Sequence, residues 1–147
     1  MLLTSIAARG RPPVTRFPRC HTDDPTSPGM RLLAQAGFTL YESPDPENIY
    51  AYTPGLERLP SGRLVATMDQ GGPGVAGLPG PKGYRGEGKN AWQGRVWTSD
   101  DGGASWQLRA LFPFMHARPF AAGGRVYVLG HDGDLMAMAS DDQGITW

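Results

Sequence analysis

Four side chains that can bind or protonate a polar ligand stand near the ends of predicted strands: Tyr52, Asp69, His116 and Arg118. A carboxylic acid such as Asp69 can act as a general acid. His116 and Arg118 can orient a ligand through hydrogen bonds and charge, and Tyr52 offers an aromatic face for stacking. We therefore take Asp69 as the candidate catalytic residue and the other three as candidate substrate-binding residues.

Each candidate also has a purely structural interpretation. Asp69 ends a predicted strand, where a carboxylate can simply cap the following loop. His116 and Arg118 lie in the mainly apolar segment 112–120, where a buried imidazole or guanidinium needs hydrogen-bond partners. Tyr52 suits a hydrophobic core as well as a ligand surface. The sequence leaves these alternatives open.

Five further charged or polar residues are weaker candidates. His131 and Asp132 have the spacing of an ordinary turn. Arg85, Glu87 and Lys89 fall in a glycine-rich stretch, where solvated charges are the simpler interpretation.

The elements that position these residues are indicated by an internal repeat. The pattern Ser-x-Asp-x-Gly-x-x-Trp begins at Ser99 and again at Ser140. Each copy follows a strand-like run, Arg95–Thr98 or Leu135–Met138. The interval between the copies is about 40 residues, which matches one four-stranded blade of a β-propeller.

The residue types of the repeat predict a tight turn. Serine and aspartate oxygens accept backbone N–H bonds, Gly103 and Gly144 tolerate a positive φ, and the closing tryptophans supply apolar area. A metal site at Asp101 or Asp142 is the weaker alternative, because one carboxylate per turn falls short of a calcium loop.

The repeated motif resembles the Asp-box, or BNR repeat, of sialidase-like β-propellers. The resemblance implies an all-β fold consisting of two blades of a six-bladed sialidase-like β-propeller, incomplete by about four blades. It places the boxes at the rim away from the catalytic face. We expect a partial propeller over 30–147, after a segment 1–29 that is rich in arginine and proline, lacks periodicity and is predicted to be disordered.

Blade one is expected at about 50–110 and blade two at about 116–147, which stops before its fourth strand. The run 38–41 is expected to be a further strand that completes another blade. The predicted blade strands are Tyr52–Leu59, Arg63–Met68, Arg95–Thr98, Trp106–Ala110, Ala117–Ala121, Arg125–Leu129 and Leu135–Ala139.

An insertion at about 70–93 distinguishes blade one. The sequence Gly62-Arg63 matches Gly124-Arg125. The number of residues from the first pair to the second is here called the Gly-Arg offset. This offset is larger than the number of residues from the first box to the second. Blade one therefore carries extra residues before its box. Glycines recur in them at every third position from Gly71 to Gly86. Collagen stability needs many such triplets on three chains, so a flexible loop is expected.

The resemblance to sialidases extends to particular residues. Their Phe/Tyr-Arg-Ile-Pro motif, whose arginine grips the substrate carboxylate, corresponds to Ala51–Pro54, with Tyr52 in place of the arginine. A tyrosine cannot replace that bidentate clamp. Asp69, or alternatively Glu87, could take the place of the family's acid/base aspartate. The nucleophilic tyrosine, its glutamate partner and the other arginines of the family belong to later blades.

Composition excludes some other classes. Fourteen basic and fourteen acidic residues cancel, so no net field favours nucleic acid, and no apolar run is long enough for a membrane span. Cys20 is the one cysteine, so neither an internal disulfide nor a zinc cluster is implied. We expect no cofactor and no metal, and the sequence leaves the cellular compartment open.

The resulting functional expectation is a sialidase-like glycoside hydrolase of the BNR superfamily that acts on carbohydrate, with this truncated chain inactive by itself. The alternative is a non-catalytic β-propeller that binds glycans or proteins. A tyrosine–glutamate pair and two further arginines in a longer reading frame would favour hydrolysis.

Overall fold

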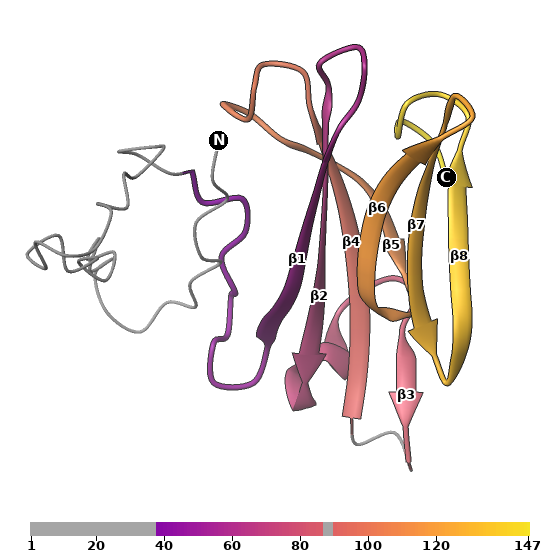
Figure 1. The fold of residues 1–147 in the computed structure, drawn as a ribbon. Coiled ribbons are helices and arrows are strands. Elements are labelled where there is room, and N and C mark those ends of the chain that lie inside the picture. Colours follow the sequence, from indigo (N-terminus) through magenta and orange to yellow (C-terminus); the bar gives the residue numbers. More distant parts are fainter. Residues whose placement is uncertain (1–37, 87–89) are drawn as a thin grey trace, which may run out of the picture.

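The computed structural model describes residues 38–86 and 90–147, and nearly all of its regular structure is β-strand (Figure 1). The segment 1–29, predicted to be disordered, lies outside the described residues. Within the described ranges no α-helix occurs, and hence no helix that could span a membrane. The elements are β1 (Tyr50–Arg58), β2 (Leu64–Gly72), the 3-10 helix η1 (Pro73–Gly77), β3 (Gly83–Arg85), β4 (Asn90–Ser99), β5 (Gln107–Phe112), β6 (Met115–Ala122), β7 (Arg125–Asp132) and β8 (Asp134–Ser140).

The strands form two antiparallel sheets, which confirms the all-β prediction. Sheet A has the order β1-β2-β4, with β3 and β5 both paired to the far edge of β4. β3 pairs with the first part of β4 and β5 with the later part, so the two lie end to end. Sheet B has the order β6-β7-β8.

The main core lies between the sheets. It contains Val65 and Val96 of sheet A and Val126 and Val128 of sheet B, all at most 2% exposed. Burying each such valine stabilises the fold by about 1.5–3 kcal/mol. Among the hydrogen bonds that join the two layers, Thr67 Oγ1 donates to a main-chain carbonyl of β6 at 3.0 Å.

The first Ser-x-Asp-x-Gly-x-x-Trp motif forms the turn from β4 to β5, as predicted. Ser99 Oγ accepts the N–H of Gly103 and donates to Asp101 Oδ1, both at 2.8 Å. Asp101 also accepts the N–H of Ser105 at 2.9 Å and its hydroxyl. Trp106 Nε1 donates to the Gly103 carbonyl at 3.1 Å and closes the turn.

The second motif repeats this network after β8. Ser140 Oγ accepts the N–H of Gly144 at 2.7 Å, and Asp142 accepts the N–H of Thr146 at 2.8 Å and its hydroxyl at 2.6 Å. Trp147 Nε1 donates to the Gly144 carbonyl at 3.0 Å. The two motifs are therefore equivalent in structure as well as in sequence. Hydrogen bonds hold the pKa values of both motif carboxyls, Asp101 and Asp142, well below the usual range.

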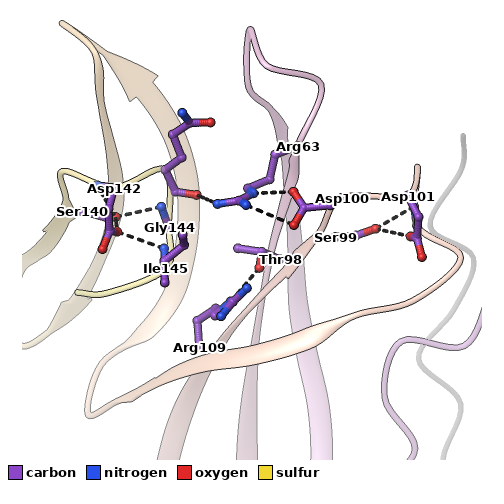
Figure 2. A network of polar contacts seen from close by, with 12 residues as sticks. Arg63, Thr98, Ser99, Asp100, Asp101, Arg109, Ser140, Asp142, Gly144 and Ile145 are labelled. Atoms are coloured by element: carbon purple, nitrogen blue, oxygen red, sulfur yellow. Dashed lines mark hydrogen bonds and ion pairs between the residues drawn. The ribbon is translucent and has the colours of Figure 1, made fainter.

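An arginine and an aspartate form the same bidentate ion pair in each sheet. Arg63 donates to Asp100 through Nε at 2.6 Å and Nη2 at 3.0 Å (Figure 2), and Arg125 donates to Asp141 in the same way. Arg63 also reaches the carbonyl of Gln143 at 3.3 Å, which links the first repeat to the turn of the second. These pairs confirm the alignment of the two Gly-Arg sequences.

The segment 38–49 contains no strand, so the predicted strand at 38–41 is wrong. It lies over the outer face of sheet A and is held there by side chains. The ring of Tyr41 packs on Trp97 at 6.3 Å and lies under the guanidinium of Arg95 at 5.1 Å. Tyr41 also accepts a hydrogen bond from the amide of Gln70.

The insertion at 70–93 is not an unstructured loop over its described residues. β2 and β4 extend into it, and η1 and β3 lie within it. The amide of Gln93 donates to the carbonyls of Pro79 and Pro81 at 2.8 and 3.0 Å. Val75 packs in a second cluster with Ile49. Side-chain packing therefore gives this segment an order that its glycine content does not predict.

The connections divide between the two ends of the sheets. The β1–β2 turn and both Ser-Asp-Gly-Trp turns lie at one end (Figure 1). The β2–β4 insertion, the β5–β6 connection and the β7–β8 turn lie at the other. The candidate residues occur on the second set of strand ends, as the sequence predicted.

Candidate functional site

A cavity of about 310 Å³ lies at the end of the sheets opposite the Ser-Asp-Gly-Trp turns. This volume is at the lower limit of small-ligand pockets. Both sheets contribute to its wall, which is made of Tyr52, Asp69, Gln70, Gly71, Gly72, Arg85, Asn90, Ala91, Trp92, Met115 and His116. Three of the four predicted site residues, Tyr52, Asp69 and His116, are thus brought together.

Asp69 is the buried acid of this cavity, with 2% of the residue exposed. Its Oδ2 accepts the hydroxyl of Thr53 at 2.5 Å and the main-chain N–H of His116. Its Oδ1 is buried without a hydrogen-bond partner among the described residues. Burial raises the pKa of Asp69, and the hydrogen bonds from Thr53 and His116 offset this only in part. The carboxyl is therefore suited to carrying a proton.

Two aromatic side chains line the cavity. Tyr52 is 47% exposed, and its ring lies against the backbone of Gly71, where an added Cβ would come within 2.8 Å of the ring. Trp92 is buried and donates from Nε1 to the carbonyl of Pro113 at 3.0 Å. Tyr52 consequently keeps much of its apolar surface available to a ligand.

His116 is fixed at two points. Its main-chain N–H bonds to Asp69, and its ring Nδ1 lies 2.7 Å from Nε2 of His131. The two imidazoles are tilted by 54° with centroids 4.8 Å apart. The φ of His116 is +56°, a left-handed conformation that non-glycine residues seldom adopt. Such strain concentrates at functional sites.

Both sheets build this end in the same way. The register of β1 with β2 shifts between Tyr52 and Gly55, and that of β6 with β7 shifts between Met115 and Arg118. Each irregularity contains one left-handed residue: Thr53, with φ +46°, or His116.

The partners of the two left-handed residues are also equivalent. His131 follows Asp69 by the Gly-Arg offset, the same separation that relates Arg125 to Arg63. Thr53 bonds through its side chain to Asp69, and His116 bonds through its side chain to His131. A β-bulge can redirect a side chain toward such a partner. The repeat therefore places two hydrogen-bonded pairs, Thr53–Asp69 and His116–His131, at one end of the molecule.

Arg118 does not line the cavity. Its Nη1 donates to the carbonyls of Thr53 at 2.8 Å and Ala117 at 3.1 Å. Arg118 therefore connects β6 to the bulge of β1, and through Thr53 it supports Asp69. Its predicted contact with substrate stays a prediction.

Among the weaker candidates, Arg85 lines the cavity from β3. Glu87 and Lys89 lie outside the described residues. His131 belongs to the site through its contact with His116, whereas Asp132 pairs with Asp134 at the β7–β8 turn.

Sequence reasoning gave His131 too little weight and did not select Thr53. A signal for His131 was available, because the Gly-Arg offset makes it equivalent to Asp69. Thr53 could not be found in this way, because its left-handed φ and the bulge depend on contacts with β6.

A second cavity, of about 340 Å³, lies at the opposite end and has a different chemistry. Neither an acid nor a histidine lines it. Its wall is made of Leu59, Pro60, Ser61, Ala121, Ala122, Gly123, Gly124, Arg125, Val126 and Gln143. The cavity at Asp69 is therefore the better candidate for acid–base chemistry.

The described residues contain no cluster of three or more histidine, cysteine, aspartate or glutamate side chains that could hold a metal ion. Compared with protein-family models and with curated proteins, the sequence matches none of them.

Proposed function

We propose that the cavity at Asp69 binds a sugar ring and that the chain is part of a sialidase-like glycoside hydrolase. The observation that carries this proposal is the buried carboxyl of Asp69, which lines the cavity with one oxygen unpaired and a raised pKa. A carboxyl whose pKa is raised by burial holds its proton to higher pH and can donate it to a leaving-group oxygen.

Three of the lining residues have roles in the proposed reaction. Asp69 protonates the glycosidic oxygen as the bond to the anomeric carbon breaks. The face of Tyr52 stacks against the sugar, and the ring of His116 bonds to its hydroxyls. The nucleophile that attacks the anomeric carbon is water or a group supplied by a further repeat.

The proposed architecture is two blades of a six-bladed β-propeller. The equivalence of the two sheets supports it. Val126 and Val128 face sheet A, so the alternating residues Tyr127 and Leu129 face the other way. Tyr127 is equivalent to Val65 by the Gly-Arg offset. Val65 faces sheet B, so the equivalent face of sheet B, which carries Tyr127, points away from sheet A. A further blade would pack there.

The second candidate function is a non-catalytic propeller that binds glycans or proteins. It is favoured by Tyr52, which occupies the position at which sialidases carry the carboxylate-binding arginine. An aromatic ring at this position cannot form the bidentate carboxylate contact that the guanidinium makes in sialidases, which lowers the preference for carboxylated sugars.

The test is a titration of the full chain with methyl glycosides, comparing hexosides, hexuronides and sialosides by tryptophan fluorescence. At least one class is expected to bind. Because Trp92 lines the cavity, a bound glycoside should change its fluorescence. No response to any of the three classes would contradict the proposal.

Hydrolysis is tested separately with fluorogenic glycosides of the class that binds. If Asp69 is the acid, any turnover should fall by about 100-fold or more in Asp69→Asn, while binding of the methyl glycoside persists. Binding without turnover in a longer protein that carries further repeats would favour the non-catalytic alternative.

A further inference from the structure

His131 contacts the site without lining the cavity. Its Nε2 lies 2.7 Å from His116 Nδ1, and it is half-buried on β7. His116 is exposed and lines the cavity. An exposed imidazole at a cavity rim ordinarily samples several rotamers. A hydrogen bond to one ring nitrogen restricts the ring to one orientation and leaves the other nitrogen for a ligand.

We propose that His131 is a positioning residue that holds the ring of His116 so that Nε2 of His116 is left to bind a sugar hydroxyl. This inference rests on the proposed function of the cavity. It assigns to the second repeat the arrangement found in the first, where Asp69 on β2 holds the side chain of Thr53 on β1.

The backbone supports the same assignment. His116 keeps a left-handed φ of +56°, which is unfavourable for a residue with a Cβ. The hydrogen bond from its main-chain N–H to Asp69 and the ring contact with His131 fix that conformation from both sheets. The imidazole is thus preorganised, and a ligand need not order it on binding.

One nitrogen of each imidazole takes part in the contact. A neutral imidazole has one N–H donor and one bare nitrogen acceptor, so one of the two rings donates and the other accepts. In either case Nδ1 of His116 is occupied by His131, and Nε2 is the ring nitrogen left for a ligand. When Nδ1 donates, Nε2 accepts, and when Nδ1 accepts, Nε2 donates. A sugar hydroxyl can both donate and accept, so it can bond to Nε2 in either tautomer.

The first measurement needs no ligand. Scalar couplings about the Cα–Cβ bond of His116, measured by NMR in the full chain, should show a single χ1 rotamer, which becomes an average over several rotamers in His131→Leu. His131→Gln can still donate or accept a hydrogen bond and should restore the single rotamer. Asp132→Asn, at the neighbouring exposed position on β7, is the control and should leave these couplings unchanged. Rotamer averaging of His116 in the wild-type chain would overturn the proposal.

The second measurement is the affinity for the methyl glycoside that the wild-type chain binds. His131→Leu should weaken binding about fivefold to tenfold, the value of one hydrogen bond, and His131→Gln should recover most of it. Equal affinity of wild type and His131→Leu would overturn the positioning role. Failure of the wild-type chain to bind any glycoside would count against the proposed function instead, since the rotamer experiment is independent of it.

Discussion

The buried carboxyl of Asp69 makes the stability of the fold depend on pH. Because burial raises its pKa in the folded chain, the folded state binds this proton more tightly than the unfolded state does. The resulting stability is complete below the ordinary carboxyl pKa of about 4 and is lost as the pH rises through the raised value.

This pH dependence can be measured by urea unfolding of wild type and Asp69→Asn from pH 4 to pH 7. The variant lacks the titrating group, so its free energy of unfolding should improve relative to wild type as the pH rises. Other carboxyls contribute equally to both proteins and cancel. A difference that stays constant, or that moves further in favour of wild type as the pH rises, would show that burial does not raise the pKa of Asp69.

The hydroxyl of Ser99 carries a second prediction at this scale. It is buried and satisfies the N–H of Gly103 and one oxygen of Asp101. Ser99→Ala leaves a buried N–H unpaired and should cost about 1–3 kcal/mol in chemical unfolding. The equivalent Ser140→Ala should cost a similar amount, whereas Ser61→Ala, in an exposed turn, should change stability by less than about 0.5 kcal/mol. Equal effects at Ser99 and Ser61 would contradict the turn network.

Individual site residues were partly predictable from the sequence. The sequence predicts Tyr52, Asp69 and His116 as site residues because they stand near strand ends away from the two repeated turns, and they do line one cavity. Arg118 was selected for its charge, but its guanidinium is used by main-chain carbonyls of the bulge. These hydrogen bonds from Arg118 to the main chain depend on how the two sheets pack, and a local sequence pattern does not predict that packing.

At the scale of elements, β4 depends on a glycine packed against the core. A Cβ added at Gly94 would lie 1.7 Å from Cε2 of Phe112, so β5 or the core would have to shift. Gly94→Ala should destabilise the chain by about 1–3 kcal/mol. Gly77→Ala is the matched control, since an added Cβ there meets nothing within 4 Å; its effect should be within about 0.5 kcal/mol. Comparable losses of unfolding free energy in both variants would contradict this packing.

The existence of most strands was predictable because alternating and β-branched runs are bounded by turn residues. Their lengths were not. β2 continues to Gly72 and β4 already begins at Asn90. Both strands are longer than predicted because they pair with each other through glycine-rich sequence, which has a low intrinsic preference for strands. The segment 38–41 shows the opposite error: its side chains pack on Trp97, but its backbone joins no sheet.

At the scale of the whole molecule, the repeat correctly predicts which positions of the two sheets correspond. The Ser-Asp-Gly-Trp turns and the Arg–Asp pairs occur at equivalent positions in both sheets. The sequence could not show how the units face each other. That arrangement places Asp69 of sheet A against the main-chain N–H of His116 in sheet B, so the cavity exists only when both sheets are packed.

The most direct test of this account is an NMR titration that follows the four tryptophan indole N–H signals as a methyl glycoside is added to the full chain. Trp92 lines the cavity at Asp69, and Trp106 and Trp147 close the turns at the opposite end. The account predicts that the Trp92 signal shifts with saturation while those of Trp106 and Trp147 stay in place. Shifts confined to Trp106 or Trp147, or no shift at all, would contradict a sugar site at Asp69.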